Sequence, residues 1–258
     1  MNKLIPIRRF IVIASLVFIL SLSLTLNVVM ISDFNAYHKV QSTLRSFGLF
    51  RNPDLSNPNY DDFLMLISNN SRYNVHAVCE YNSSYNKDKI NIILRHDLDY
   101  NNGFKMAEME LQYDIKSTYY LRLHSSHYDV RDVLQFYKDL ENMNYEIGYH
   151  YEIVDIFLFD NETAKKVFEL ELEYLRKYFK IRSVSSHGGK YNYQFEWWAD
   201  LNQYNVISAY EMPFSKYLSD NSLEFKDRGL EYFSSELKKS NPGDTIEILI
   251  HPSRWDYS

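Results

Sequence analysis

Carboxylate and imidazole side chains follow short apolar runs at several separate places in this chain. In the clearest case, an aliphatic run that begins at Ile90 ends in Arg95, His96, Asp97 and Asp99. Such a run predicts a strand buried on both faces, as in parallel sheets covered by helices. Carboxylates and an imidazole at the end of a buried strand need a counter-charge, and a divalent metal commonly supplies it. The alternative is an ion pair of Arg95 with one aspartate that only orders a loop.

Three further histidines stand directly after predicted strands. His150 follows the strand expected over 145–149, His187 the one over 182–186 and His251 the one over 245–250. Because parallel strands with right-handed crossovers end at one rim, we expect these imidazoles to meet the aspartates there. Imidazoles and carboxylates gathered in one cleft are typical of metal-dependent hydrolases. The other histidines, which we interpret as surface or packing residues, are His38, His76, His124 and His127.

Strand and helix patterns alternate from Ile90 to the C-terminus. We expect further strands over 117–123, 206–209 and 215–218, and helices over 104–113, 130–142, 161–179, 195–201 and 230–239. This alternation predicts an α/β fold with a parallel sheet. The length and the number of units suit a barrel of fewer than eight units.

The N-terminal segment predicts a membrane helix. Lys3, Arg8 and Arg9 precede an uncharged run from Phe10 to Ile31, and ~20 apolar residues suffice to cross a bilayer. The basic flank predicts a cytoplasmic N-terminus, with the rest of the chain outside the cytoplasm. A cleaved signal peptide, which would make the protein secreted, is the alternative, but no small-x-small site follows Val28. We therefore expect a signal anchor over 1–31, a helix and polar linker region over 32–89, and a catalytic domain over 90–258.

The composition argues against one class of binding partner and against two kinds of cysteine site. The formal net charge of −6 at pH 7 argues against a nucleic-acid backbone as a partner. The single cysteine, Cys79, excludes an internal disulfide and a cysteine-rich zinc site.

Residues 90–255 resemble the polysaccharide deacetylases of the NodB-homology type, the carbohydrate esterase family 4 group. The branch whose first motif reads His-Asp-x-Asp is the most similar. The matching stretches are Arg95 to Asp99, Glu146 to Glu152, Ser185 to Gly189 and Leu249 to Trp255. The resemblance implies a distorted (β/α) barrel of about seven units and a divalent metal, with zinc as the first choice. It also implies that the substrate is an N-acetylated glycan of a cell-surface or secreted polysaccharide.

The same resemblance implies roles for individual residues. Asp97 corresponds to the general base and His251 to the general acid, while Asp99 and His150 correspond to metal ligands. Arg95, Glu152 and Trp255 are expected to orient these groups or to contact substrate.

The chain departs from the family pattern at the third metal ligand. The second motif usually carries another histidine one helical turn after the first, and Val154 stands there instead. His187 is our first choice for the missing ligand, followed by Glu152 and Asp155. The arginine-containing motif of characterised members is also replaced here, by Ser-His-Gly-Gly.

Two other functions fit the sequence less well. A barrel with a degraded metal site could bind glycan without turnover, and the missing motif histidine favours this reading. A phosphohydrolase of the HD type is the third possibility, but that class carries its His-Asp pair on helices, whereas His96 and Asp97 end a predicted strand.

Overall fold

The structure, a computed structural model, describes residues 57–69, 71–100, 103–157, 160–188 and 200–258, without the side chains of 154 and 155. These residues belong to one compact unit, Leu55–Ser258. The predicted anchor over 1–31 lies outside the described residues. Among the helices that are described, none has the length and apolarity needed to span a bilayer.

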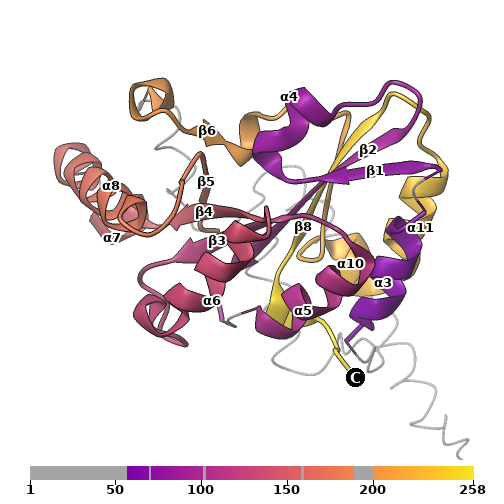
Figure 1. The fold of residues 1–258 in the computed structure, drawn as a ribbon, viewed down its shortest axis with the longest axis horizontal. Coiled ribbons are helices and arrows are strands. Elements are labelled where there is room, and N and C mark those ends of the chain that lie inside the picture. The colour runs from indigo at the N-terminus through magenta and orange to yellow at the C-terminus, as the bar shows by residue number, and fades with distance from the viewer. Residues whose placement is uncertain (1–56, 70, 101–102, 158–159, 189–199) are drawn as a thin grey trace, which may run out of the picture. The chain divides into compact units, whose positions relative to one another are not determined.

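Eight strands form one curled sheet, a half-barrel in which every pairing is parallel (Figure 1). The sheet has the order β6-β5-β4-β3-β2-β8-β7, and β1 pairs with the first half of β2. The strands are β1 (Tyr73–His76), β2 (Ile90–Leu98), β3 (Thr118–Arg122), β4 (Glu146–Tyr151), β5 (Ser183–Ser186), β6 (Ile207–Ser208), β7 (Lys216–Ser219) and β8 (Thr245–Ile250). The predicted parallel α/β architecture is confirmed. In place of the expected barrel of about seven units, the described strands form an open sheet with β6 and β7 at its edges.

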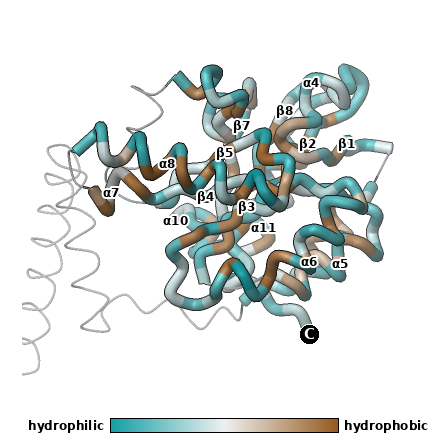
Figure 2. The backbone as a smooth tube through the Cα atoms, turned by 60° about the vertical axis from the view of Figure 1, so that its left-hand side comes forward, coloured by the Kyte–Doolittle hydropathy of each residue, from teal (hydrophilic) through white to brown (hydrophobic). Residues whose placement is uncertain are grey.

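The described residues include eight α-helices, most of which pack on the outer face of this sheet. They are α3 (Tyr60–Ile67), α4 (Tyr81–Ser84), α5 (Phe104–Tyr113), α6 (Val130–Asn142), α7 (Ile153–Phe157), α8 (Asn161–Arg176), α10 (Leu223–Arg228) and α11 (Leu230–Lys238). α8 shows why these sequences form helices: Asp160 caps its first turn, and Ala164, Phe168, Leu172 and Leu175 are its buried residues at helical spacing. Figure 2 shows apolar and polar segments alternating along this helix. The sequence predicted α5, α6, α8 and α11 and missed α4, α7 and α10, which are too short for a clear period. Most of the helix expected over 195–201 lies outside the described residues.

The folded unit begins earlier than the predicted domain boundary at residue 90. β1 pairs with β2 from Tyr73 opposite Ile90 to His76 opposite Ile93. In α3, Tyr60 and Phe63 have no exposed surface. Residues from Tyr60 onward therefore share the core of the downstream domain and do not form a separate linker. This earlier start of the folded unit was hard to predict from the sequence, because β1 has four residues and only one of them, Val75, is aliphatic.

The two faces of the sheet differ in chemistry. On β2, the outward side chains of Ile92, Leu94 and Leu98 join the large core under the helices. The inward side chains of the same strand include Asn91, Arg95 and Asp97, all buried. Strand side chains alternate between the two faces of a sheet. One strand can therefore place apolar side chains in the core under the helices and polar side chains in the interior of the half-barrel. The interior of the half-barrel therefore holds buried polar groups, which must be satisfied internally, beside a small apolar cluster that includes Ile93 and Tyr120.

This alternation moves His96 away from the predicted rim. β2 continues to Leu98, so His96 lies inside the strand and faces the helices, where its Nε2 is 2.7 Å from Glu110 Oε1. The Glu110 carboxylate also accepts hydrogen bonds of 2.7 Å from Tyr60, Ser117 and Tyr119. Burial and the charge of Glu110 raise the pKa of Tyr60 well above its usual value, so this hydroxyl remains a donor. His96 is thus a structural residue behind the sheet.

We expect Glu110→Ala to lower the free energy of unfolding by ~3 kcal/mol or more, measured by urea denaturation. Each buried donor left without an acceptor costs ~1–3 kcal/mol, and Glu110 serves four of them. Glu108→Ala, at an exposed position of the same helix, is the control and should stay within ~0.5 kcal/mol of the unmodified protein. Equal effects of the two substitutions would contradict this role for Glu110.

Candidate metal centre

Three strand ends bring Asp99, His150 and His187 together. One ligand atom from each residue lies within 4.8 Å of the others. Asp99 Oδ1 is 3.2 Å from His150 Nε2 and 3.4 Å from His187 Nε2. Asp99 follows β2, His150 lies near the end of β4, and His187 follows β5. The sequence placed these residues at one rim, and the structure brings them together there.

The donor set and its geometry fit a divalent metal. Zinc holds nitrogen and oxygen ligands at about 2.0–2.2 Å in a tetrahedron, which places neighbouring ligand atoms roughly 3.4 Å apart. His150 Nδ1 is 3.0 Å from the carbonyl oxygen of Ser185, which can only accept, so we assign the ring proton to Nδ1. His150 Nε2 then points at the Asp99 carboxylate, 3.2 Å from Oδ1, and a divalent metal bound there would replace the hydrogen bond between the two groups.

The charges of this triad suit metal binding as well. Burial of Asp99 opposes its ionisation, but the hydrogen bond with His150 and the neighbouring His187 and His251 lower its pKa to about 2. Burial, together with His150, lowers the pKa of His187. Asp99 is therefore a carboxylate and His187 a neutral imidazole at neutral pH, and these are the forms that bind metal.

Asp97 lies beside the triad and is held by Arg95. Its Oδ1 is 3.0 Å from Arg95 Nη1, and its Oδ2 is 3.8 Å from His150 Nε2. Arg95 is completely buried and also donates to Glu247 at 2.6 Å and to Ser185 at 2.9 Å. The alternative from the sequence, an ion pair of Arg95 with an aspartate, is thus present. It lies inside the half-barrel next to the triad and therefore does more than order a loop.

His251 approaches the triad with its outer nitrogen. His251 Nε2 is 3.8 Å from Asp99 Oδ2. Its other nitrogen, Nδ1, is 2.6 Å from Asp220, which also accepts the backbone N–H of His251 at 2.7 Å. Burial alone would lower the pKa of His251, but the hydrogen bond and the charge of Asp220 outweigh it and raise this pKa. The pair favours a protonated imidazole that faces the site.

Sequence reasoning missed Asp220. The residue is 1% exposed and follows β7 directly, which is the same strand-end position that identified the histidines. β7 is a short strand of four residues, Lys216 to Ser219, so the sequence marked its end only weakly.

Trp255 was expected to orient the site groups or to contact substrate. Its side chain is 3% exposed and packs against Tyr60, Phe63 and Phe225, which favours the orienting role. Its Nε1 donates to Asp220 at 3.0 Å. Trp255 is a core residue that helps to position Asp220.

Glu152 lies next to the triad but outside its ligand atoms. Its Oε2 forms an ion pair with Arg122 and is 3.7 Å from His187 Nδ1. This position fits an orienting residue better than a third ligand. The side chain of Asp155, the other alternative ligand, lies outside the described residues.

We expect Asp220→Asn to reduce turnover of the metal-loaded protein by ~10-fold or more, yet by less than the ~10²–10⁴-fold that a placed general acid supplies. The substitution removes the charge that favours the protonated form of His251. Metal content should stay unchanged, because Asp220 bonds to His251, Trp255 and the backbone and not to the triad. Asp256→Asn, at a fully exposed carboxylate, is the control. Normal turnover in the Asp220→Asn variant would show that Asp220 does not contribute to the function of the site.

Comparisons with known proteins leave the family open. No protein-family model matches the chain, and no curated protein matches it. Among solved structures, the chain is similar to the Xyl-CE4 domain of a multidomain xylanase from the hindgut metagenome of Trinervitermes trinervoides. The identity is 15% and the TM-score 0.40, over 62% of this chain and 73% of that one.

Proposed function

We propose that this protein is a metal-dependent hydrolase, with zinc as the first choice of metal, that removes N-acetyl groups from sugars of a cell-surface or secreted polysaccharide. One observation carries the reaction class. The Asp99, His150 and His187 triad has a second carboxylate, Asp97, and an Asp220-bound imidazole, His251, each with an atom 3.8 Å from one of its members. A metal site of this kind beside an acid–base pair is the arrangement that amide hydrolysis needs.

The side chains divide the work. A bound divalent metal would polarise the acetyl carbonyl and make its water more acidic. Asp97 accepts the proton of the attacking water, while Arg95 and Ser185 hold its carboxylate in place. His251 donates a proton to the departing amine, and Asp220 holds its ring in the required orientation. This assignment gives each of the two proton transfers its own residue.

The substrate and the location rest on the sequence. The His-Asp-x-Asp motif and the three later stretches resemble polysaccharide deacetylases, which supports an N-acetylated glycan. The basic N-terminus and the apolar run after it support a membrane-anchored protein with its catalytic domain outside the cytoplasm, or a secreted one if the segment is cleaved.

The decisive experiment measures metal content and acetate release together, with the full-length protein and N-acetylated chito-oligosaccharides. We expect about one equivalent of metal, and acetate release that stops with a chelator and returns with Zn²⁺. A protein that binds metal and oligosaccharide but releases no acetate would be the degraded glycan-binding barrel. A protein without metal would refute the proposal altogether.

A further inference from the structure

The carboxylate of Asp99 reaches across the sheet to the histidines of the triad. In the strand order β5-β4-β3-β2, the strand β3 stands between β2 and β4. Adjacent strands lie ~4.8 Å apart, so β2 and β4 are separated by roughly 10 Å in a sheet. Asp99 follows β2, yet its Oδ1 lies 3.2 Å from Nε2 of His150, which is on β4. The backbone at Asp99 must therefore be held in one particular position for the triad to form.

Three hydrogen bonds hold this backbone. The N–H of Asp99 donates to the carbonyl of Asp97 at 3.1 Å, which closes a three-residue turn around Leu98. Tyr128 Oη donates to the carbonyl of Leu98 at 3.0 Å. Ser125 Oγ donates to the carbonyl of Asp99 at 2.9 Å.

The two carbonyls that accept from these hydroxyls belong to the peptide groups on either side of the Asp99 Cα. A peptide group is planar, so the chain turns only at the two dihedral angles of each Cα. When both flanking planes are held, both dihedral angles of Asp99 are fixed. The direction of its side chain is then fixed at the Cα–Cβ bond.

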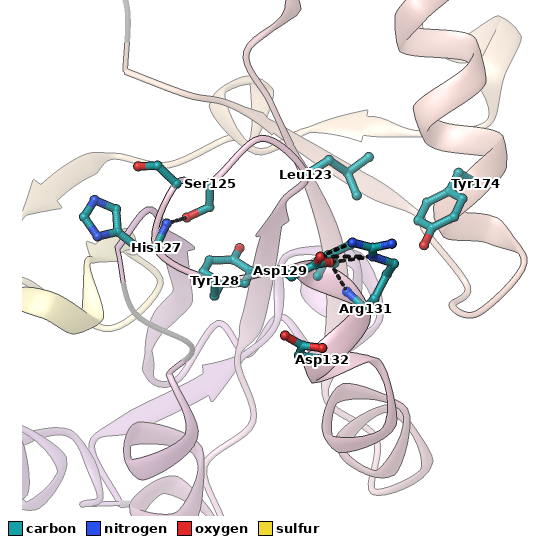
Figure 3. A pocket seen from close by; sticks show the side chains of 10 residues that line it. Leu123, Ser125, His127, Tyr128, Asp129, Arg131, Asp132 and Tyr174 are labelled. Carbon is teal, nitrogen blue, oxygen red and sulfur yellow. Dashed lines mark hydrogen bonds and ion pairs between the residues drawn. The ribbon is translucent and has the colours of Figure 1, made fainter.

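Both hydroxyls come from one loop, residues 123–129 between β3 and α6, which we call the β3–α6 loop. Figure 3 shows Ser125, His127 and Tyr128 on this loop. Tyr128 Oη also accepts the backbone N–H of Arg122 at 2.9 Å, and Ser125 Oγ accepts that of His127 at 3.2 Å. Asp129, the last residue of the loop, caps the first turn of α6. The loop is therefore tied to β3 at one end and to α6 at the other, and it can serve as a fixed support.

The Tyr128 hydroxyl bridges the two strands where their pairing stops. Leu98 lies opposite Leu121 in the last pair of β2 and β3, and Arg122 is the next residue of β3. Burial raises the pKa of Tyr128, so its hydroxyl keeps its proton and remains a donor to the Leu98 carbonyl. Such bonds could serve only to satisfy two carbonyls at a strand end. Their position on both sides of one candidate ligand indicates a more specific role.

We propose that Ser125 and Tyr128 are positioning residues of the metal centre, which hold Asp99 in the place where its carboxylate can bind a metal. Both act through the backbone of Asp99 and not as ligands. The inference rests on the proposed function for the presence of the metal, and it extends the site to a loop that supplies no ligand. A ligand that is held in place before binding loses little conformational entropy when the metal binds. Loss of either bond should therefore weaken metal binding.

The test measures the Zn²⁺ affinity of the full-length protein by competition with a chelator. Ser125→Ala and Tyr128→Phe should each lower this affinity about tenfold, at the lower end of the ~10–100-fold that residues orienting a metal ligand contribute. Ser126→Ala, at an exposed serine of the same loop, and Tyr60→Phe, whose hydroxyl bonds to Glu110 behind the sheet, are the matched controls. Neither control should change the affinity by more than about twofold. Ser125→Thr retains a hydroxyl and should restore most of the affinity that Ser125→Ala loses.

Urea unfolding of the metal-free variants separates positioning from stability. Tyr128→Phe and Tyr60→Phe each remove a tyrosine hydroxyl that bonds inside the protein, so both should lower the unfolding midpoint. Only Tyr128→Phe should also weaken Zn²⁺ binding. Equal Zn²⁺ affinity in each loop variant and its control would overturn the inference. Zn²⁺ affinities that follow the expected pattern without any acetate release would support it and would refute only the deacetylase activity.

Discussion

Asp97→Asn is expected to retain bound metal and to lose ~10²–10⁴-fold in turnover, the contribution of a placed general base. Asparagine has nearly the same shape but cannot accept the proton of water. The bonds of Asp97 to Arg95 and Ser185 show that it lies outside the Asp99, His150 and His187 triad, so the ligand set should survive. Metal analysis of the purified variant beside an acetate-release assay checks both parts of the expectation.

Glu247→Gln is the matched control for this variant. Glu247 is the other carboxylate that contacts the Arg95 guanidinium, at 2.6 Å, and it belongs neither to the triad nor to the acid–base pair. This substitution perturbs the pairing of Arg95 to a similar extent. If Glu247→Gln loses as much turnover as Asp97→Asn, the effect comes from a displaced Arg95, and Asp97 is not the base.

His187→Ala tests the departure of this chain from the family pattern. Removing a residue that only hydrogen-bonds to a metal ligand typically lowers metal affinity ~10–100-fold. We expect His187→Ala to lower metal affinity by more than this. The reason is that His187 Nε2 lies 3.4 Å from Asp99 Oδ1, where it can serve as the third ligand of the proposed metal site. Competition with a chelator of known affinity measures the change, and Asp99→Ala and His150→Ala should behave alike.

Two other variants separate a ligand from a neighbour. Glu152→Gln should fall within the ~10–100-fold range, because Glu152 contacts His187 from the side away from Asp99. His124→Ala should retain full affinity, because His124 is paired with Glu171 and is not among the ligand atoms. Undiminished metal in His187→Ala with loss in Glu152→Gln would assign the third ligand to Glu152.

The strands that carry the site could be predicted because their signal is local. β2 and β8 are mostly apolar runs that end at polar residues, and a strand buried by helices leaves that pattern in the sequence. A polar residue directly after such a run must lie at the carboxyl edge of a parallel sheet. This reasoning placed Asp99, His150, His187 and His251 on one rim before any distance between them was known.

Residues inside strands were harder, because the face of a side chain depends on where its strand ends. His96 and Asp97 are adjacent, yet His96 bonds to Glu110 behind the sheet and Asp97 to Arg95 inside it. The expectation that β2 ended before these residues put both at the rim. Successive side chains of a strand point to opposite faces. A difference of a few residues in where β2 ends therefore decides whether His96 packs behind the sheet or lies at the rim with the site.

The sequence by itself determined the parallel α/β architecture and the residues at four strand ends, since both follow from burial over a few consecutive positions. Only the tertiary structure decided the partners. Asp220 and His251 directly follow the adjacent strands β7 and β8, Trp255 turns inward to hold Asp220, and residues before the predicted boundary pair with β2. These contacts join positions far apart in the chain, and their geometry arises from the curl of the sheet, which no short stretch of sequence records.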